Sequence, residues 1–299
     1  MCGIIGILGG HEVSPQLVEA LKRLEYRGYD SAGVATVDDA GQLDRRRAVG
    51  KLINLSDRLV HEPLTGHAGI GHTRWATHGA ATEQNAHPHR RGPVAVVHNG
   101  IIENFRELRD EVIALGLQPE SQTDTEVVAH LIHHYRAQGG SLLQALQRAV
   151  KELHGAYALA VISRKEPERM VVARMGCPLL VGLGEGENFL GSNVAAFVAY
   201  TKHAMELGQD QAVCISGDQV IVTDFNGNPV KDSKRFTVDW DASAAEKGGW
   251  PSFMDKEIHE DPEAVANTLL GRFDDQGDIV LDVNGTTIDS TKTLERLAN

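Results

Sequence analysis

The sequence is poor in cysteine and lacks any long apolar run. Its three cysteines, Cys2, Cys177 and Cys214, are far apart, odd in number and without CxxC spacing, which argues against a disulfide framework and a zinc site. No apolar segment approaches the roughly 20 residues that cross a bilayer. The first residues show no basic region followed by an apolar stretch and a cleavage site. We therefore expect a cytoplasmic protein with no signal peptide and no membrane contact.

A sustained stripe of lysine and arginine is also missing. The net charge is −12, and the only basic run, Arg45–Arg47, is expected to be a solvated turn or strand edge. Because an acidic protein repels phosphate backbones, nucleic-acid binding is disfavoured. The length of 299 residues, with 41% hydrophobic and 23% charged residues, predicts a soluble protein with one main domain and an appendage.

Short apolar segments separated by turn residues predict many strands with a few helices between them. Strands are expected at 2–8, 31–37, 69–75, 94–100, 156–164, 169–174, 178–184, 188–193, 211–216 and 219–225. The first helix is expected to have Ser14 as its N-cap and Pro15 as its first residue, and to end near Tyr26. Further helices are expected at 103–116, 123–140, 141–153 and 253–272.

This succession predicts an α/β or α+β layered sandwich, with helices outside two or more sheets, rather than one doubly wound sheet. The glycine-rich segment 182–191 is not a GxGxxG motif, and we expect it to be a hairpin. The segment 239–249 is rich in Asp, Ala, Glu, Lys and Gly and marks a boundary. We therefore expect one domain over 2–240 and a separate segment over 241–299.

Cys2 is the first candidate catalytic residue. Its side chain is small enough for Met1 to be trimmed, which would leave a thiol and a free α-amine on one residue. Since the amine titrates at about 7.7–8.0 and the thiol near about 8.5, the amine can take the thiol proton close to neutral pH. Taken alone, however, Cys2 is better interpreted as a small apolar residue that opens a buried strand. Other residues shift that balance.

Three further segments combine polar groups suited to binding an amino acid. In HTRWATHG (72–79), a strand runs into a loop, and Arg74 is suited to bidentate capture of a carboxylate. In VVHNG (96–100), the amide of Asn99 and the backbone N–H of Gly100 could form an oxyanion hole, although Asn-Gly is also a common hairpin turn. Asp124, at a helix start, could hold an α-ammonium group or simply act as an N-cap.

The fourteen histidines raise the question of a metal site. His87 and His89, in AHPH, have no acidic or thiol partner at a ligand spacing. His130, His133 and His134 fall on one helix but lack the HExxH pattern. We therefore expect no metal.

Six motifs occur in order along the chain: MCGIIGI at the start, LEYRGYDSAG (24–33), HTRWATHG (72–79), NAHPH (85–89), VVHNGIIEN (96–104) and TDTEV (123–127). Taken together, they resemble the glutaminase half of glutamine–fructose-6-phosphate aminotransferase. The resemblance runs from residue 2 to about 240, and 253–272 resembles the start of that family's following segment. It implies a class II amidotransferase with the α+β, four-layer αββα sandwich of the N-terminal-nucleophile hydrolases, and no cofactor.

The resemblance also implies roles for individual residues. Cys2 would attack the side-chain amide of L-glutamine, its α-amine would act as the base, and Asn99 and Gly100 would stabilise the oxyanion. Arg74 would bind the α-carboxylate and Asp124 the α-ammonium group. Arg27 would brace the N-terminal residue, and Trp75 would act as a lid over the ammonia route. Thr77 and His78 would close the pocket.

Two features depart from the family pattern. Asn193 stands where family members commonly carry aspartate, which bears on a local hydrogen-bond network. The family's sugar-phosphate isomerase (SIS) domains are not found, and 241–299 is expected to be a linker and the truncated start of one. The chain would then release ammonia but need isomerase domains, in the same full-length chain or in trans, to make glucosamine-6-phosphate. A monomer or weak homodimer is expected.

Two alternatives remain open from the sequence. The first is the glutaminase module of another class II enzyme, such as an asparagine synthetase or an amidophosphoribosyltransferase. YRGYDSAG and the segment after residue 250 argue against it. The second is a non-catalytic module that binds glutamine, which retention of Met1 would favour because a blocked amine cannot act as a base.

Overall fold

A computed structural model describes residues 2–28, 30–239, 249–250, 253–269, 281–283 and 286–288. The chain divides into two units, Met1–Ala245 and Glu246–Asn299. Among the described residues, no helix combines the length and the apolar character needed to cross a membrane.

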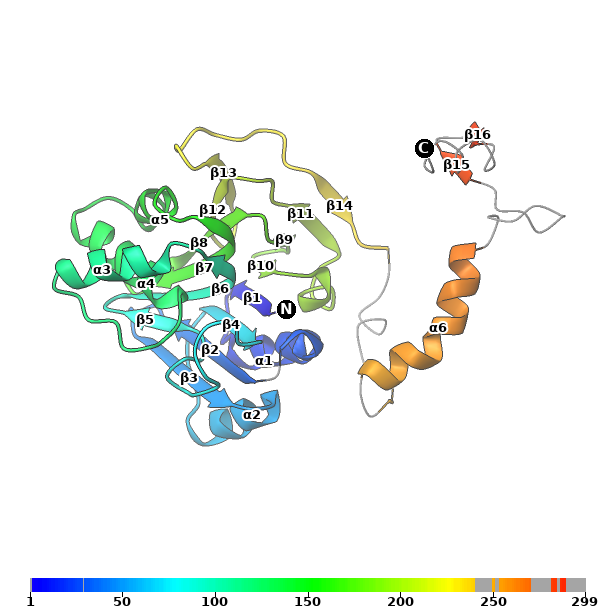
Figure 1. Cartoon of the computed structure of the whole chain (residues 1–299), viewed down its shortest axis with the longest axis horizontal. Helices are drawn as coiled ribbons and strands as arrows, with labels where there is room; N and C mark the ends of the chain where they lie inside the picture. The colour runs from blue at the N-terminus through cyan, green and yellow to red at the C-terminus, as the bar shows by residue number, and fades with distance from the viewer. Residues whose placement is uncertain are drawn as a thin grey trace. The chain divides into compact units, whose positions relative to one another are not determined.

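Two antiparallel sheets form the first unit (Figure 1). The first sheet has eight strands, in the spatial order β14 (Arg235–Thr237), β11 (His203–Glu206), β9 (Leu180–Leu183), β10 (Asn188–Gly191), β1 (Gly3–Leu8), β4 (Ala68–Arg74), β2 (Ser31–Val37) and β3 (Leu43–Val49). The second sheet has six, in the order β13 (Val220–Asp224), β12 (Gln211–Ile215), β8 (Glu166–Met175), β7 (Gly155–Ser163), β6 (Val94–Ile102) and β5 (His89–Arg91).

The sheets pack face to face, and both outer faces are covered as well. Strand β1 illustrates the consequence, since all six of its residues are buried. Ile4 and Leu8 belong to the core between the sheets, whereas Ile5 and Ile7 belong to the core beneath the helices of the first sheet. Alternate side chains of a strand point to opposite faces, so a strand covered on both sides must be apolar throughout. The uninterrupted apolar run at the start of the chain follows from this position.

Helices form the two outer layers (Figure 1). The first sheet is covered by α1 (Ser14–Lys22) and α2 (Leu52–His61), whose apolar residues share one core with β1 and β2. The second sheet is covered by α3 (Phe105–Ala114), α4 (Thr125–Ala137) and α5 (Leu142–Val150). The predicted four-layer αββα sandwich is therefore confirmed.

Most of the predicted elements are present, but the start and end of the first helix were wrong. Helix α1 begins at Ser14 after the N-cap Val13 and ends at Lys22, and a separate 3₁₀ helix, η1 (Glu25–Arg27), follows. The sequence did not predict β3, α2, β5, β11 or β14, which are three to ten residues long. The predicted hairpin at 182–191 is confirmed by the pairing of β9 with β10.

The second unit contains the helix α6 (Phe253–Leu269) and a hairpin of β15 (Leu281–Val283) and β16 (Thr286–Ile288). The last residues of the predicted helix, 270–272, lie outside the described residues. The assignment of 241–299 to a linker and the start of an isomerase domain stays a prediction.

Candidate active site

Seven of the nine predicted site residues line one cavity. They come from the start of β1, the end of β4 with the loop after it, the second half of β6, and the start of α4, and they are Cys2, Arg74, Trp75, Thr77, His78, Gly100 and Asp124. Asn99 contacts Cys2 directly through a hydrogen bond. Arg27 lies beside a neighbouring cavity with Ser192 and Asn193. Sequence reasoning missed His98, Thr123 and Thr125 as lining residues, and assigned no role to His87.

The pairing of β1 with β4 sets the position of the Cys2 thiol. Gly3 lies opposite Thr73, so Cys2 is beside the end of β4. Its Sγ is 3.3 Å from the backbone nitrogen of Trp75 and 3.5 Å from the carbonyl oxygen of the same residue. The pKa of the Cys2 thiol is raised, mainly because the thiol is buried. The hydrogen bond from the Trp75 backbone lowers the pKa but does not offset the burial. A thiol with a raised pKa is protonated at neutral pH and needs a base before it can attack.

Asn99 and Gly100 approach Cys2 from the second sheet. The Asn99 side-chain nitrogen donates to the carbonyl oxygen of Cys2 at 3.0 Å, and its oxygen lies 3.0 Å from Nε2 of His72. Gly100 has a φ of +124°, and a Cβ at this position would lie 2.0 Å from the carbonyl oxygen of Ala156. Only glycine fits there, because both the backbone conformation and the neighbouring strand exclude a side chain.

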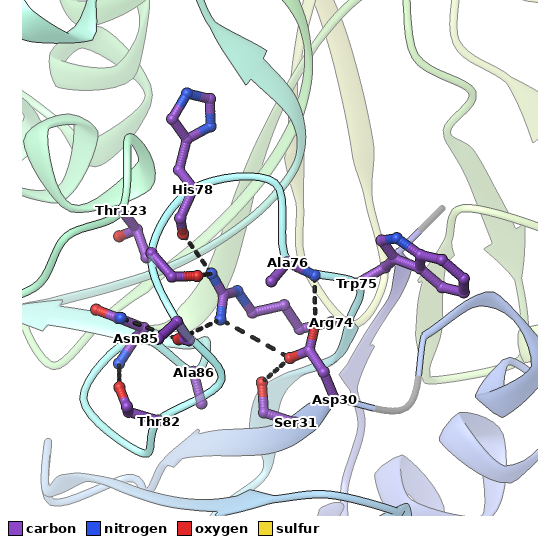
Figure 2. Close-up of polar contacts among 12 residues, drawn as sticks. Asp30, Ser31, Arg74, Trp75, Ala76, His78, Thr82, Asn85, Ala86 and Thr123 are labelled. Atoms are coloured by element: carbon purple, nitrogen blue, oxygen red, sulfur yellow. Dashed lines mark hydrogen bonds and ion pairs between the residues drawn. The ribbon is translucent and has the colours of Figure 1, made fainter.

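Arg74 is 3% exposed and holds the loop 75–80 in place (Figure 2). Its guanidinium donates to the carbonyl oxygens of Ala80 at 3.2 Å and Gly79 at 3.2 Å, and also to that of His78. Asp30 lies 3.8 Å from it and accepts a hydrogen bond from the backbone of Ala76. This arginine therefore organises the loop. Its predicted grip on a carboxylate stays a prediction.

Asp124 occupies the N-cap position of α4, but its side chain makes no capping hydrogen bond. Its Oδ2 instead accepts from the backbone nitrogen of Ile102 at 2.9 Å and lies 3.9 Å from Nδ1 of His98. The side chain thus ties α4 to β6 within the cavity wall. The interpretation of Asp124 as a simple capping side chain is wrong, because strand β6 rather than the helix supplies its donor.

The loop after β4 forms the exposed rim of the cavity. Trp75 is 48% exposed, and Figure 2 shows its indole directed away from the Arg74 guanidinium. The hydroxyl of Thr77 lies 3.4 Å from Nδ1 of His78, whose ring packs edge-on against Phe105 with centroids 5.0 Å apart. The rim is therefore held mainly by hydrogen bonds from Arg74 to its backbone carbonyls, and less by packing of its own side chains.

Buried histidines form the wall behind Asn99. The rings of His72 and His87 are 4.2 Å apart, and those of His87 and His89 are 4.9 Å apart. Burial lowers the pKa of His72 to about 3 and that of His89 to about 3, and it also lowers the pKa of His87 and His98. The described residues contain no group of three or more His, Cys, Asp or Glu side chains that could hold a metal ion.

The arginines of β3 fasten this wall to the first sheet. The Arg45 guanidinium donates to the carbonyl oxygen of Pro88 at 3.0 Å, and that of Arg47 donates to Ala86 at 2.8 Å. Burial lowers the pKa of Arg47 to about 10. The basic run does lie on an edge strand, but the expectation that it is solvated was wrong, because two of its side chains reach the segment that carries His87.

Asn193 makes a local hydrogen bond through its side chain. Its side-chain oxygen accepts from the backbone nitrogen of Ala195 at 2.9 Å and caps the 3₁₀ helix η2 (Val194–Ala196). The preceding Ser192 bonds to the backbone of Ile4 on β1 and accepts a 3.4 Å hydrogen bond from Arg27 through its carbonyl oxygen. Arg27 therefore contacts the segment that pairs with β1.

Two solved structures share the fold of this domain. The glutamine phosphoribosylpyrophosphate amidotransferase from B. subtilis matches with a TM-score of 0.66 and 27% identity, covering 76% of this chain and 50% of that one. A class-II glutamine aminotransferase domain protein from Silicibacter pomeroyi matches the fold with a TM-score of 0.53 and 16% identity, over 75% of this chain and 99% of that one. The first unit is an amidotransferase domain of the N-terminal-nucleophile type.

Sequence comparisons agree and are more specific. Residues 72–199 match the glutamine amidotransferase domain model. Glutamine–fructose-6-phosphate aminotransferases (isomerizing) from Leifsonia xyli and Streptomyces coelicolor are 56% and 53% identical, over 91% and 94% of this chain but 44% and 46% of their own lengths. The first unit therefore contains a glutamine amidotransferase domain, and the chain spans less than half the length of the curated relatives it matches.

Proposed function

We propose that this chain hydrolyses L-glutamine to glutamate and ammonia through the thiol of Cys2, as the glutaminase part of a glutamine–fructose-6-phosphate aminotransferase. One observation carries the proposal: the side-chain nitrogen of Asn99, on the second sheet, donates a 3.0 Å hydrogen bond to the carbonyl oxygen of Cys2, beside the first sheet. A nucleophile beside a fixed amide donor is the arrangement that acyl transfer requires.

The reaction begins with attack of the thiol on the side-chain amide carbon of glutamine. Removal of Met1 exposes the α-amine of Cys2, which takes the thiol proton as the C–S bond forms. The oxyanion is held by the side-chain nitrogen of Asn99 and the backbone N–H of Gly100. Collapse of this intermediate expels ammonia, to which the ammonium group of Cys2 returns the proton. Water then cleaves the thioester, so that one glutamine and one water give one glutamate and one ammonia.

The substrate is bound at its α-carbon by two charges of opposite sign. Arg74 attracts the α-carboxylate and Asp124 the α-ammonium group, with Thr77 and His78 closing the cavity from the rim. The support for this assignment is that Arg74 and Asp124 are both buried and both line the cavity that contains Cys2. Water is largely excluded there, so each charge interacts more strongly with a ligand than at the surface.

The ammonia is passed on to a sugar-phosphate isomerase domain, in the same full-length chain or in trans, to make glucosamine-6-phosphate. Trp75, at the exposed rim, covers the route by which ammonia leaves, and Arg27 braces the N-terminal residue through the segment at Ser192. The support is the high identity to relatives that carry this activity in their names. A cytoplasmic location and a monomeric or weakly dimeric state of this chain remain predictions from the sequence.

Glutamate release by three forms of the chain tests the proposal. Intact-mass analysis first establishes that Met1 has been removed. The wild-type chain should release glutamate from L-glutamine, Cys2→Ala should not, and the matched control Cys177→Ala should retain the activity. A glutamine-like electrophile should add once to the wild type and to the control, and not to Cys2→Ala. Equal glutamate release by the wild type and Cys2→Ala would eliminate the proposal.

A further inference from the structure

His72 is a fully buried side chain that the reaction above does not use. It lies on β4, opposite Ile4 of β1, and is 0% exposed. Its Nε2 is 3.0 Å from the carbonyl oxygen of His98 and 3.0 Å from the side-chain oxygen of Asn99. It therefore spans from the first sheet to the strand of the second sheet that carries the oxyanion hole.

The neighbours of this ring determine which nitrogen carries the proton. A backbone carbonyl only accepts hydrogen bonds, so the His98 oxygen requires a hydrogen on Nε2 of His72. The Cys2 carbonyl likewise requires that Asn99 face it with its NH₂ group, which turns the Asn99 oxygen towards His72. Two acceptors thus demand the same Nε2–H, and Nδ1, which is buried without a hydrogen-bond partner, is the unprotonated nitrogen.

The surroundings also keep the ring uncharged. The charged or titratable groups that face it are Arg74 on its own strand, His98 on β6 and His87 in the stacked ring, and burial adds the largest effect. None of these groups is an anion that would stabilise an imidazolium. The ring is consequently a fixed neutral donor throughout the neutral pH range.

We infer that His72 is a positioning residue, whose Nε2–H holds the side-chain amide of Asn99 with its nitrogen towards Cys2 and so presets the oxyanion hole. This inference rests on the proposed function. If the amide turned over, its NH₂ would meet the Nε2–H of His72 and its oxygen would meet the Cys2 carbonyl, giving two repulsive contacts. Within the described residues, the Asn99 nitrogen has the Cys2 carbonyl as its only recorded acceptor, which leaves its second N–H for the substrate oxygen.

The kinetic test compares His72→Leu with His72→Gln. Leucine removes the donor, whereas the glutamine amide can place an N–H close to the position of Nε2. We expect kcat for glutamate release to fall about 10- to 100-fold in His72→Leu, somewhat less than for outright loss of an oxyanion-hole donor. KM should change by less than about threefold, since Asn99 acts on the transition state. His72→Gln should recover kcat to within about fivefold of wild type.

Two controls separate positioning from general damage. His130→Leu removes another fully buried histidine, one with no bond to Asn99, and should leave kcat unchanged even if it lowers Tm. Alkylation of Cys2 by iodoacetamide is a displacement that forms no oxyanion, so its rate should be equal in wild type and His72→Leu. Loss of both alkylation and turnover would instead indicate a disrupted nucleophile and would overturn the inference.

Nitrogen NMR of the wild-type chain tests the inference without any variant. The His72 ring should show the Nε2–H tautomer and no titration between pH 5 and 9. An Nδ1–H tautomer, a titration near pH 6.5, or a His72→Leu variant with kcat within twofold of wild type would each overturn it. Absence of glutaminase activity in the wild type would instead refute the proposed function, which distinguishes the two failures.

Discussion

The floor and the rim of the cavity are built in different ways. The floor (Cys2, His72, Asn99, Gly100 and Asp124) lies on strands of both sheets and at the start of α4. Hydrogen bonds that are buried or partly buried join these parts. The rim (Trp75, Thr77 and His78) is a loop whose side chains are partly exposed. Its backbone is held mainly by one buried arginine, Arg74, shown in Figure 2.

This difference matches the functions of the two parts, stabilisation of charge by the floor and passage of substrate and products through the rim. Groups that stabilise a developing charge have to be fixed before the reaction begins, and rigid strands supply that order. A rim has to admit glutamine and release products, and a loop fastened at one point can do so without disturbing the floor. We therefore expect changes at floor residues that act on the developing charge, such as Asn99, to lower kcat, and changes in the anchor of the rim to raise KM.

After Cys2→Ala, the largest effect is expected for Asn99→Ala. Loss of one oxyanion-hole donor typically costs about 10²- to 10³-fold in kcat. KM for glutamine should stay within about threefold, because the lost contact is made mainly in the transition state. Steady-state glutamate release measures both constants. A variant in which KM rises while kcat is unchanged would show that Asn99 belongs functionally to substrate binding, and the contrast between floor and rim would fail.

The next effect is expected for Arg74→Lys. Lysine keeps the charge but cannot reach three loop carbonyls and a ligand in the forked geometry of a guanidinium. Hydrogen bonds to charged groups contribute about 1.5–3 kcal/mol, so kcat/KM should fall about 10- to 150-fold, chiefly through KM. The same assay measures it, and limited proteolysis should show faster cleavage within 75–80. An unchanged KM would show that the rim does not depend on this anchor.

The sequence predicted the floor better than the contacts that support it. Cys2, Asn99 and Gly100 stand out because their residue types suit acyl transfer, and Asp124 stands out as an acid at a helix start. The β1 strand is apolar because both of its faces are covered. The hydrogen bonds from Arg45 and Arg47 to the segment at His87 could not be predicted. The two arginines are about 40 positions away from that segment in the sequence, and they reach it only because the two sheets pack together. The short edge strands β5 and β14, of three residues each, carry too little pattern to be recognised.

The buried histidines of the wall behind Asn99 should make folding sensitive to acid. The folded-state pKa values of His72 and His89 are about 3, below the roughly 6.5 of an unfolded histidine. Between these values the unfolded chain binds protons that the folded chain does not, so stability is full above about pH 6.5 and falls as the pH is lowered. Each such histidine contributes about 1.4 kcal/mol per pH unit.

Urea unfolding followed by circular dichroism at pH 7.5, 6 and 5 measures this dependence. Stability should decrease at each step, and His72→Gln should show a shallower decrease than wild type, because one proton-binding site of the unfolded chain has been removed. Equal slopes for the two proteins would mean that His72 is protonated in the folded state, contrary to a neutral floor.

The smallest effect is expected for Asn193→Asp, which replaces the side-chain amide with a carboxylate. Asn193 caps η2 through its side-chain oxygen, and it lines a different cavity from the one that contains Cys2. Asparagine and aspartate are about equally good N-caps, so Tm should change by only about 1 °C and kcat/KM by less than about twofold. Asn193→Ala, which loses the cap, should lower the free energy of unfolding by about 1 kcal/mol. A large gain in kcat with aspartate would show instead that a charge at this position acts on Cys2 through Ser192 and Arg27, and the floor would then extend beyond the cavity wall.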